Sequence, residues 1–143
     1  PAFVKGMHRF QWSGTYPEFI SAAAATAIKF HETLGTGRKE ARVKYLGNYW
    51  RSKLAKLDGV RFVTTTDEDA SCGLGVFEIA KVDSEKLQKH LWERHKVLVQ
   101  NMTGGDRDPR INSIRVTPNV YTTLGELDRF VDLVSTAVKK GLV

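Results

Sequence analysis

The sequence predicts an α+β domain: a small, mainly antiparallel sheet with helices packed on one face. Two stretches with apolar residues three and four positions apart come first, a spacing typical of helices. Short segments rich in β-branched residues then occur as two pairs, separated by a further helical stretch, and a helical stretch ends the chain. The order helix, helix, strand, strand, helix, strand, strand, helix favours hairpin-like strand pairs and a one-sided helical layer.

The helices are predicted from their ends as well as from their apolar stripes. Pro17 suits a first helical turn, and Gly35 and Gly37 suit a helix end. Thr123 and Glu126 form a capping box for the last helix. The four expected helices cover residues 17–34, 38–57, a segment capped by Asp83 or Ser84 that runs to His95, and a segment that begins at the Thr123 box.

The strands are predicted from β-branched residues and from the turn residues between them. The expected strands cover residues 60–65, 73–80, 97–100 and 113–117, with loops at 66–71 and 103–109. Side chains expected to face the core include His31, Tyr45, Leu46, Tyr49, Leu54, Phe62, Leu74, Val76, Phe77, Leu87, Leu91, Trp92, Leu127, Val131, Val134 and Val138.

Composition narrows the class of protein. The chain has 143 residues, a single cysteine and no apolar run of the roughly 20 residues that a membrane helix needs. It carries 22 Lys and Arg against 16 Asp and Glu, a formal net charge of +6, which favours an anionic partner such as a nucleic acid or a phosphorylated small molecule. We therefore expect a cytoplasmic protein with no membrane segment and no disulfide framework.

The spacing of histidine and cysteine favours neither a metal site nor a catalytic triad. The four histidines lack a ligand spacing, and His90 and His95, five residues apart, are expected to lie off a common helical face. His31 is on an apolar stripe, so a hydrogen-bonded core histidine is expected. Cys72 has no nearby histidine and is expected to be a buried structural thiol.

A glycine and a hydroxyl residue, Gly14 and Thr15, stand just before the helix that Pro17 opens. Free backbone N–H groups and the partial positive charge at a helix N-terminus suit a phosphate, and the Thr15 hydroxyl offers a further donor. The alternative is that Thr15 is only an N-cap.

An arginine, Arg115, lies inside the last predicted strand, between Ile114 and Val116. Because side chains alternate along a strand, Arg115 points away from the face that its two apolar neighbours share. Its planar guanidinium can bind a carboxylate through two parallel hydrogen bonds. The alternative is an internal ion pair with Asp or Glu.

Taken together, these segments resemble a known family. The runs RFQWSGTYPEF, FHETLG and SIRVTPNVYTTLGELDRFVDLV are similar to the C-terminal part of class V aminotransferase-type enzymes, across essentially all 143 residues. This group of pyridoxal 5'-phosphate (PLP) enzymes of fold type I includes cysteine desulfurases, isopenicillin N epimerase-like proteins and kynureninase-like hydrolases. The resemblance implies the C-terminal small domain of a fold type I PLP enzyme.

The resemblance also implies roles for these residues. Thr15, with Gly14, would contact the phosphate of PLP, commonly that of the neighbouring subunit of a homodimer, and Arg115 would bind the α-carboxylate of an amino acid substrate. Residues 1–36 would be the connecting segment and helix that lead from a missing N-terminal PLP-binding domain, and residues 37–143 the small domain.

The resemblance is incomplete where catalysis is concerned. The Schiff-base lysine of this family lies well upstream of the Gly-Thr element, and Lys5 has neither that distance nor the strand context. The chain begins at Pro1 rather than Met, and we expect a fragment that is inactive alone, with no catalytic residue and no metal of its own.

The chemistry is narrowed by a missing cysteine. Cysteine desulfurases carry a nucleophilic cysteine in the loop before the carboxylate-binding strand, and residues 100–112 contain none. This favours the isopenicillin N epimerase-like branch, with epimerase, lyase or aminotransferase activity left open. One alternative is a desulfurase-like enzyme without that cysteine. A second is a basic nucleic-acid-binding module, which would need aromatic residues on its open sheet face. A third is a regulatory domain that does not depend on a cofactor.

Overall fold

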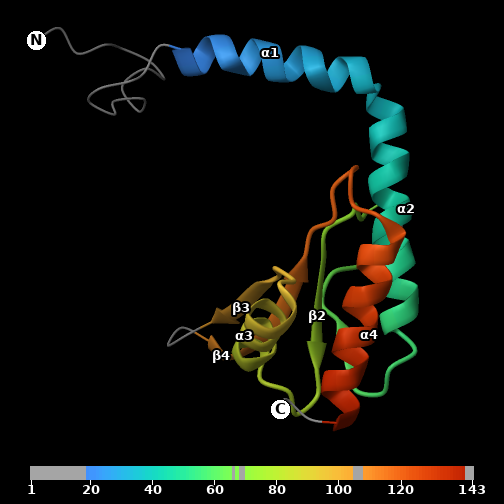
Figure 1. The fold of residues 1–143 in the computed structure, drawn as a ribbon, viewed down its shortest axis with the longest axis vertical. Coiled ribbons are helices and arrows are strands. Elements are labelled where there is room, and N and C mark those ends of the chain that lie inside the picture. The colour runs from blue at the N-terminus through green and yellow to red at the C-terminus, as the bar shows by residue number, and fades with distance from the viewer. Residues whose placement is uncertain (1–18, 66, 68–69, 105–107, 141–143) are drawn as a thin grey trace, which may run out of the picture. The chain divides into compact units, whose positions relative to one another are not determined.

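A computed structural model describes residues 19–65, 67, 70–104 and 108–140. It confirms the α+β class and the predicted order of elements (Figure 1). The four strands form one antiparallel sheet in the order β1-β2-β4-β3. The elements are α1 (Phe19–Leu34), α2 (Thr36–Leu54), β1 (Val60–Phe62), β2 (Gly75–Ile79), α3 (Ser84–His95), β3 (Gln100–Gly104), β4 (Asp108–Val116) and α4 (Leu124–Lys140).

The chain divides into two compact units between Thr36 and Gly37, so that α1 belongs to the first unit and the whole sheet to the second. In α1 the apolar side chains are exposed, Phe19 at 74% and Phe30 at 61%. His31, expected in a core, is also exposed, because a single helix cannot bury its own stripe and the described part of its unit contains no second element.

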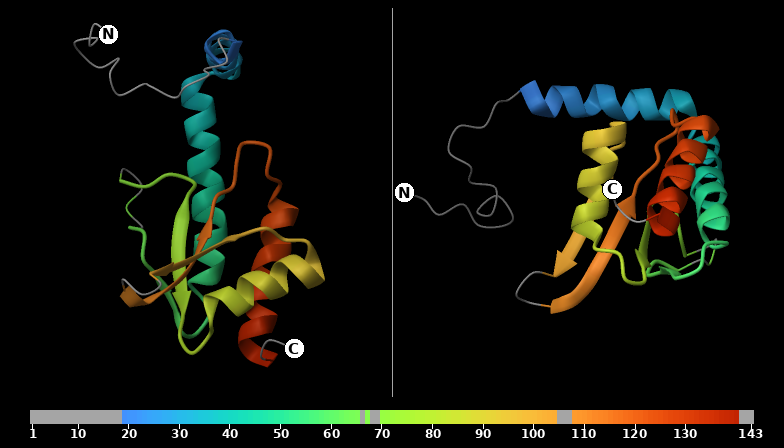
Figure 2. Two further views of the ribbon diagram at one scale, coloured as in Figure 1. Left: turned by 90° about the vertical axis from the view of Figure 1, so that its left-hand side faces the viewer. Right: turned by 60° about the horizontal axis from the view of Figure 1, so that its bottom comes forward.

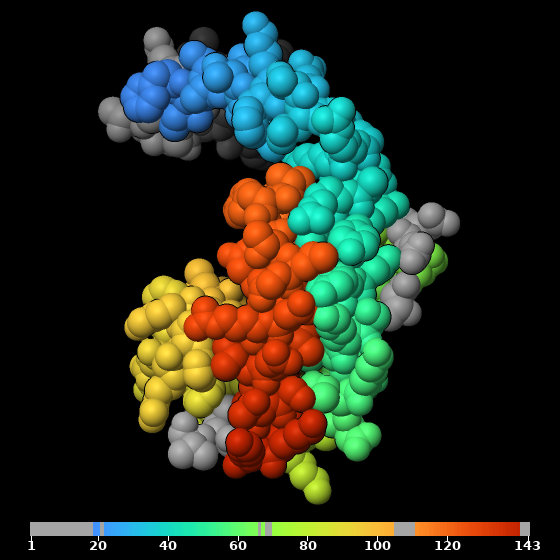
Figure 3. All heavy atoms as spheres, turned by 45° about the vertical axis from the view of Figure 1, so that its right-hand side comes forward, coloured from blue at the N-terminus to red at the C-terminus, as the bar shows by residue number. Residues whose placement is uncertain are grey.

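The core of the second unit lies between one face of the sheet and α2, α3 and α4. Trp50 of α2 is fully buried, with its ring 5.9 Å from that of Phe77 and 6.2 Å from that of Phe130. Helix α4 runs beside α2 (Figure 2), and the two pack directly against each other in the space-filling view (Figure 3). The buried apolar residues are Leu46, Trp50, Leu54, Phe77, Ile79, Leu87, Leu91, Val99, Ile114, Val116, Leu127, Phe130, Val131, Val134 and Ala137.

Two strand predictions are wrong in position. The third strand was expected over 97–100 and lies at Gln100–Gly104. The fourth was expected over 113–117 and lies at Asp108–Val116, so residues 103–104 and 108–109 of the expected loop belong to strands. Pro109 can lie inside β4 because the pairing of β4 with β2 reaches only as far as Ile114, which leaves one edge of β4 open at the proline.

The helix predictions are closer. Helix α3 is capped by Asp83, whose carboxylate accepts hydrogen bonds from the backbone N–H groups of Glu85 and Lys86, and it ends at His95 as expected. Helix α2 begins and ends two to three residues early, since Gly35 alone separates it from α1 at a φ of 82°, whereas Gly37 is helical.

Some inward-facing residues were also assigned wrongly. Tyr45 and Trp92 are 50% and 45% exposed, Leu74 is exposed just before β2, and Val76 lies on the face of the sheet that Arg115 shares, away from the core. Trp50 and Arg51 are buried instead, which turns the inner face of α2 by about one residue relative to the predicted stripe. Phe62 and Phe77 lie in or against the core, as predicted.

Candidate functional site

The candidate site is on the face of the sheet opposite the helices of the second unit. Along β4, Ile114 and Val116 face the core and are 2% and 7% exposed. Ser113 and Arg115 therefore project from the opposite face, since side chains alternate along a strand. This open face includes Glu78 of β2, which accepts a hydrogen bond from the Ser113 hydroxyl at 2.9 Å.

Strand register places Arg115 in the middle of the sheet. Its Cα partners are Val76 on β2 and Gln100 on β3. Residues directly opposite each other in an antiparallel pair share a face, so an apolar side chain flanks Arg115 on one side and an amide on the other. The Gln100 amide donates to the backbone carbonyl of Asn101 at 2.9 Å.

The guanidinium of Arg115 has no internal partner among the described residues. The side chain is half-buried, and its Nε is buried without a hydrogen-bond acceptor. The internal ion pair that the sequence left open is therefore absent from the described part of the chain. A buried donor without an acceptor costs about 1–3 kcal/mol, so this position is suited to an acceptor from outside the chain.

Glu78, an acid of the open face, is already engaged. Glu78 Oε2 accepts from Arg61 Nη2 at 2.5 Å, and its Oε1 accepts from Ser113 Oγ at 2.9 Å. Arg61 comes from β1, where it pairs in register with Glu78. The polar groups around Arg115 thus form a row across three strands, from Arg61 through Glu78 to Ser113.

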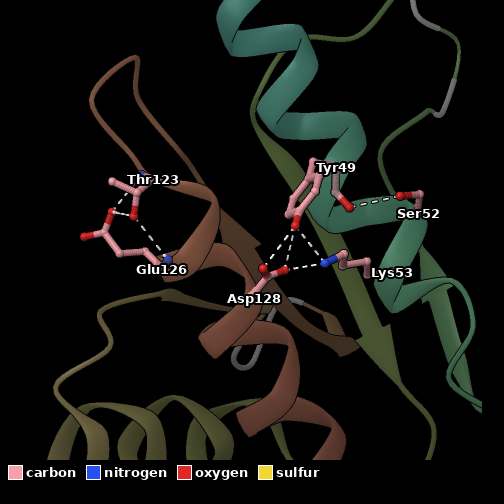
Figure 4. A network of polar contacts seen from close by, with 6 residues as sticks. All are labelled: Tyr49, Ser52, Lys53, Thr123, Glu126 and Asp128. Carbon is pink, nitrogen blue, oxygen red and sulfur yellow. Dashed lines mark hydrogen bonds and ion pairs between the residues drawn. The ribbon is translucent and has the colours of Figure 1, made fainter.

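A second polar network ties α2 to α4 (Figure 4). The Tyr49 hydroxyl donates to Asp128 at 2.9 Å, and Lys53 pairs with the same carboxylate. The hydrogen bonds from Lys53 and Tyr49 lower the pKa of Asp128, and the bond to Asp128 raises the pKa of Lys53. This network joins two helices and contains no polar group of the open face, so its role is structural.

The predicted phosphate contacts, Gly14 and Thr15, lie outside the described residues, as does Lys5. The assignment of the PLP phosphate to Thr15 and Gly14 remains a prediction. Arg115 and its surroundings are the part of the proposed site that the structure describes.

Cys72 is exposed, so the expectation of a buried thiol is wrong. It precedes β2, where its backbone carbonyl accepts a hydrogen bond from Arg51 Nη2 at 3.3 Å. The separation expected of His90 and His95 is also wrong, because the two rings meet edge to face at 5.2 Å where α3 ends. Across the described residues, no group of three or more His, Cys, Asp or Glu side chains could hold a metal ion.

Sequence reasoning found Arg115 and missed the residues around it. The sequence did hold a signal for these neighbours, because polar residues at alternating strand positions are expected on the face away from the core. The residues are Arg61, Glu78, Gln100 and Ser113. Only the register shows that they share one face.

In the described part of the chain, no helix is both long and apolar enough to cross a bilayer.

Comparisons with known proteins agree with the resemblance seen in the sequence. No protein-family model matches the chain. It is 28% identical to isopenicillin N epimerase of Streptomyces clavuligerus over 128 residues, which are 89% of this chain and 31% of that protein. The chain therefore spans about a third of the length of this curated relative.

Solved structures show the same fold. The cysteine desulfurase CsdA of Escherichia coli matches 94% of this chain with a TM-score of 0.73 and 18% identity, over 34% of its own length. A C-DES mutant with glycine covalently linked to the PLP cofactor matches 76% of this chain with a TM-score of 0.59 and 20% identity, over 26% of its length. Together these matches confirm the resemblance to the C-terminal part of class V aminotransferase-type enzymes.

Proposed function

We propose that this relative of the class V aminotransferase-type enzymes is the C-terminal domain of a PLP-dependent enzyme that acts on an amino acid, and that Arg115 binds the substrate α-carboxylate. The observation that carries the proposal is the guanidinium of Arg115, which lies on the open sheet face without an acceptor among the described residues. The similarity to isopenicillin N epimerase and the fold shared with a solved structure that contains PLP support it.

Arg115 suits a carboxylate better than it suits a single acceptor atom. The guanidinium is planar and offers parallel N–H donors that match the two oxygens of a carboxylate. Its aliphatic arm is held in the central part of the sheet, between Val76 and Gln100, so the fork is already oriented before a ligand arrives.

When bound, PLP supplies an electron sink that stabilises a carbanion at the substrate Cα. The role proposed for this chain is orientation. By fixing the carboxylate, Arg115 would hold the substrate in one orientation relative to the cofactor. Gly14 and Thr15 would hold the cofactor phosphate. The whole enzyme is proposed to be a cytoplasmic homodimer, with its PLP-binding domain outside this chain.

The β3–β4 hairpin favours chemistry without a persulfide. Cysteine desulfurases place a nucleophilic cysteine before the carboxylate-binding strand, and here that stretch contains none. Cys72 belongs instead to the segment before β2, which Arg51 joins to α2. An isopenicillin N epimerase-like, lyase or aminotransferase activity is therefore proposed.

The test uses the natural PLP-loaded protein that contains this chain, with glycine as the probe and the absorbance of bound PLP as the readout. Replacing Arg115 with Ala removes a charge-assisted hydrogen-bond pair worth about 1.5–3 kcal/mol, so the apparent Kd of glycine should rise about 10- to 100-fold. Arg115→Lys keeps the charge without the fork and should give an intermediate loss.

The matched control is Arg94→Ala, which removes an exposed arginine from α3 and should leave glycine binding unchanged. An unchanged Kd in Arg115→Ala, with the fold intact by circular dichroism, would contradict the proposed role of Arg115.

A further inference from the structure

We infer that Arg61 is a positioning residue for substrate binding: together with Ser113 it holds Glu78 away from Arg115, so that Arg115 stays available to a carboxylate from outside the chain. This inference rests on the proposed role of Arg115. It concerns residues of the open sheet face that do not themselves touch a substrate carboxylate.

The first step is that Glu78 can reach Arg115. Val76 is the direct partner of Arg115 on β2, and Glu78 lies two residues further along the same strand, on the same face. Such diagonal neighbours have Cβ atoms about 7 Å apart or less, a gap that long side chains cross readily. A glutamate and an arginine in this relation would ordinarily form an ion pair.

The second step is that both oxygens of Glu78 are taken elsewhere. Arg61 binds Oε2 at 2.5 Å and the Ser113 hydroxyl binds Oε1 at 2.9 Å. The side chain of Glu78 is 22% exposed, whereas that of Arg61 is 69% exposed. The more exposed arginine therefore pairs with the acid, and the half-buried one, Arg115, is left without a partner among the described residues.

The third step is what removal of Arg61 would do. Glu78 Oε2 would lose the cation that it pairs with, and Arg115 lies on the same face, one diagonal position away, with no partner among the described residues. The internal carboxylate would then compete with a substrate carboxylate for the same guanidinium. A partly exposed ion pair is weak, so the expected competition is modest, about fivefold.

The test has a structural readout and a binding readout. In a crystal structure of the Arg61→Gln chain, Glu78 should move to within 4 Å of the Arg115 guanidinium. In the natural PLP-loaded protein, Arg61→Gln should raise the apparent Kd of glycine about fivefold. The double variant Arg61→Gln/Glu78→Gln removes the competing charge and should bind glycine as the wild type does, and Arg61→Lys should preserve most of the affinity.

These outcomes separate the inference from the proposed function. If Arg115→Ala weakens glycine binding but Glu78 stays on Ser113 in the Arg61→Gln structure, the inference is wrong and the role of Arg115 stands. A double variant that binds as poorly as Arg61→Gln would also overturn it, because the loss would then be unrelated to Glu78. If Arg115→Ala has no effect, the proposed function itself fails. Arg94→Gln is the matched change of charge on α3 and should have no effect.

Discussion

The contact between Gly75 and Trp50 predicts a large cost for adding one methyl group. Gly75 begins β2, and a Cβ at this position would lie 2.6 Å from Cζ2 and 2.9 Å from Cη2 of the Trp50 ring. Carbon atoms in contact are normally about 3.5–4.0 Å apart, so the ring or the strand would have to move by about 1 Å. Trp50 is fully buried and packs against other aromatic rings, so it has no open space to move into.

The magnitude follows from two opposing effects. Overpacking a dense core costs about 1–3 kcal/mol, and the immobile ring places Gly75→Ala at the upper end of that range. Loss of backbone freedom in the unfolded chain returns about 0.4–1 kcal/mol. The free energy of unfolding should therefore fall by about 2 kcal/mol. With an m-value of about 2 kcal/mol/M in urea, the midpoint of unfolding should fall by about 1 M.

Urea unfolding followed by tryptophan fluorescence and circular dichroism measures this midpoint. Trp50→Phe removes the two ring carbons that the methyl group would meet, so Gly75→Ala should cost less than half as much in the Trp50→Phe background. Gly125→Ala is the matched control, because a Cβ there meets nothing within 4 Å. A Gly75→Ala midpoint equal to that of the wild type, or an equal loss in both backgrounds, would refute the argument from the clash.

Two further predictions concern polar contacts. Asp83→Ala removes the side chain that caps α3 through two backbone N–H groups, and it should lower the unfolding free energy by about 1 kcal/mol in urea; no change would mean that the cap contributes nothing. Asp128 has a pKa lowered by its hydrogen bonds to Lys53 and Tyr49, so its stabilising effect is present above its ordinary pKa of about 4 and is lost as pH falls through the lower folded value. Melting curves should therefore show the stability advantage of the wild type over Asp128→Asn shrinking as pH falls from 5 to 2, and a pH-independent difference would contradict this.

Local signals predicted the helices well and the third strand badly. The cap of α3 and its inward residues Leu87 and Leu91 depend on neighbours within one turn, which the sequence displays directly. The third strand depends on a distant partner. Val97 and Val99 have high β propensity, but β4 pairs instead with a polar segment that begins at Gln100, because ladder register overrides the preference of a short run.

The candidate site divides in the same way. Arg115 could be predicted from alternation within one strand, because Ile114 and Val116 fix the face to which it points. Its neighbours could not be predicted, since Glu78 and Arg61 come to share a face with it only through the pairing of three strands. A shift of one residue in the register of β2 would move Glu78 to the helical face and leave Arg61 without its partner.

The absence of a partner for Arg115 links the stability of the domain to the affinity of the proposed site. A buried N–H without an acceptor costs about 1–3 kcal/mol, and that cost is already included in the free energy of folding. A carboxylate that reaches Arg115 therefore meets donors that are partly desolvated and held in place by the sheet, so more of the interaction energy is available for binding. An internal pair with Glu78 would consume the same donors, and it would also cost Glu78 its contacts with Arg61 and Ser113. In the proposed role of Arg115, the contacts of Glu78 with Arg61 and Ser113 therefore leave these donors available to a substrate carboxylate.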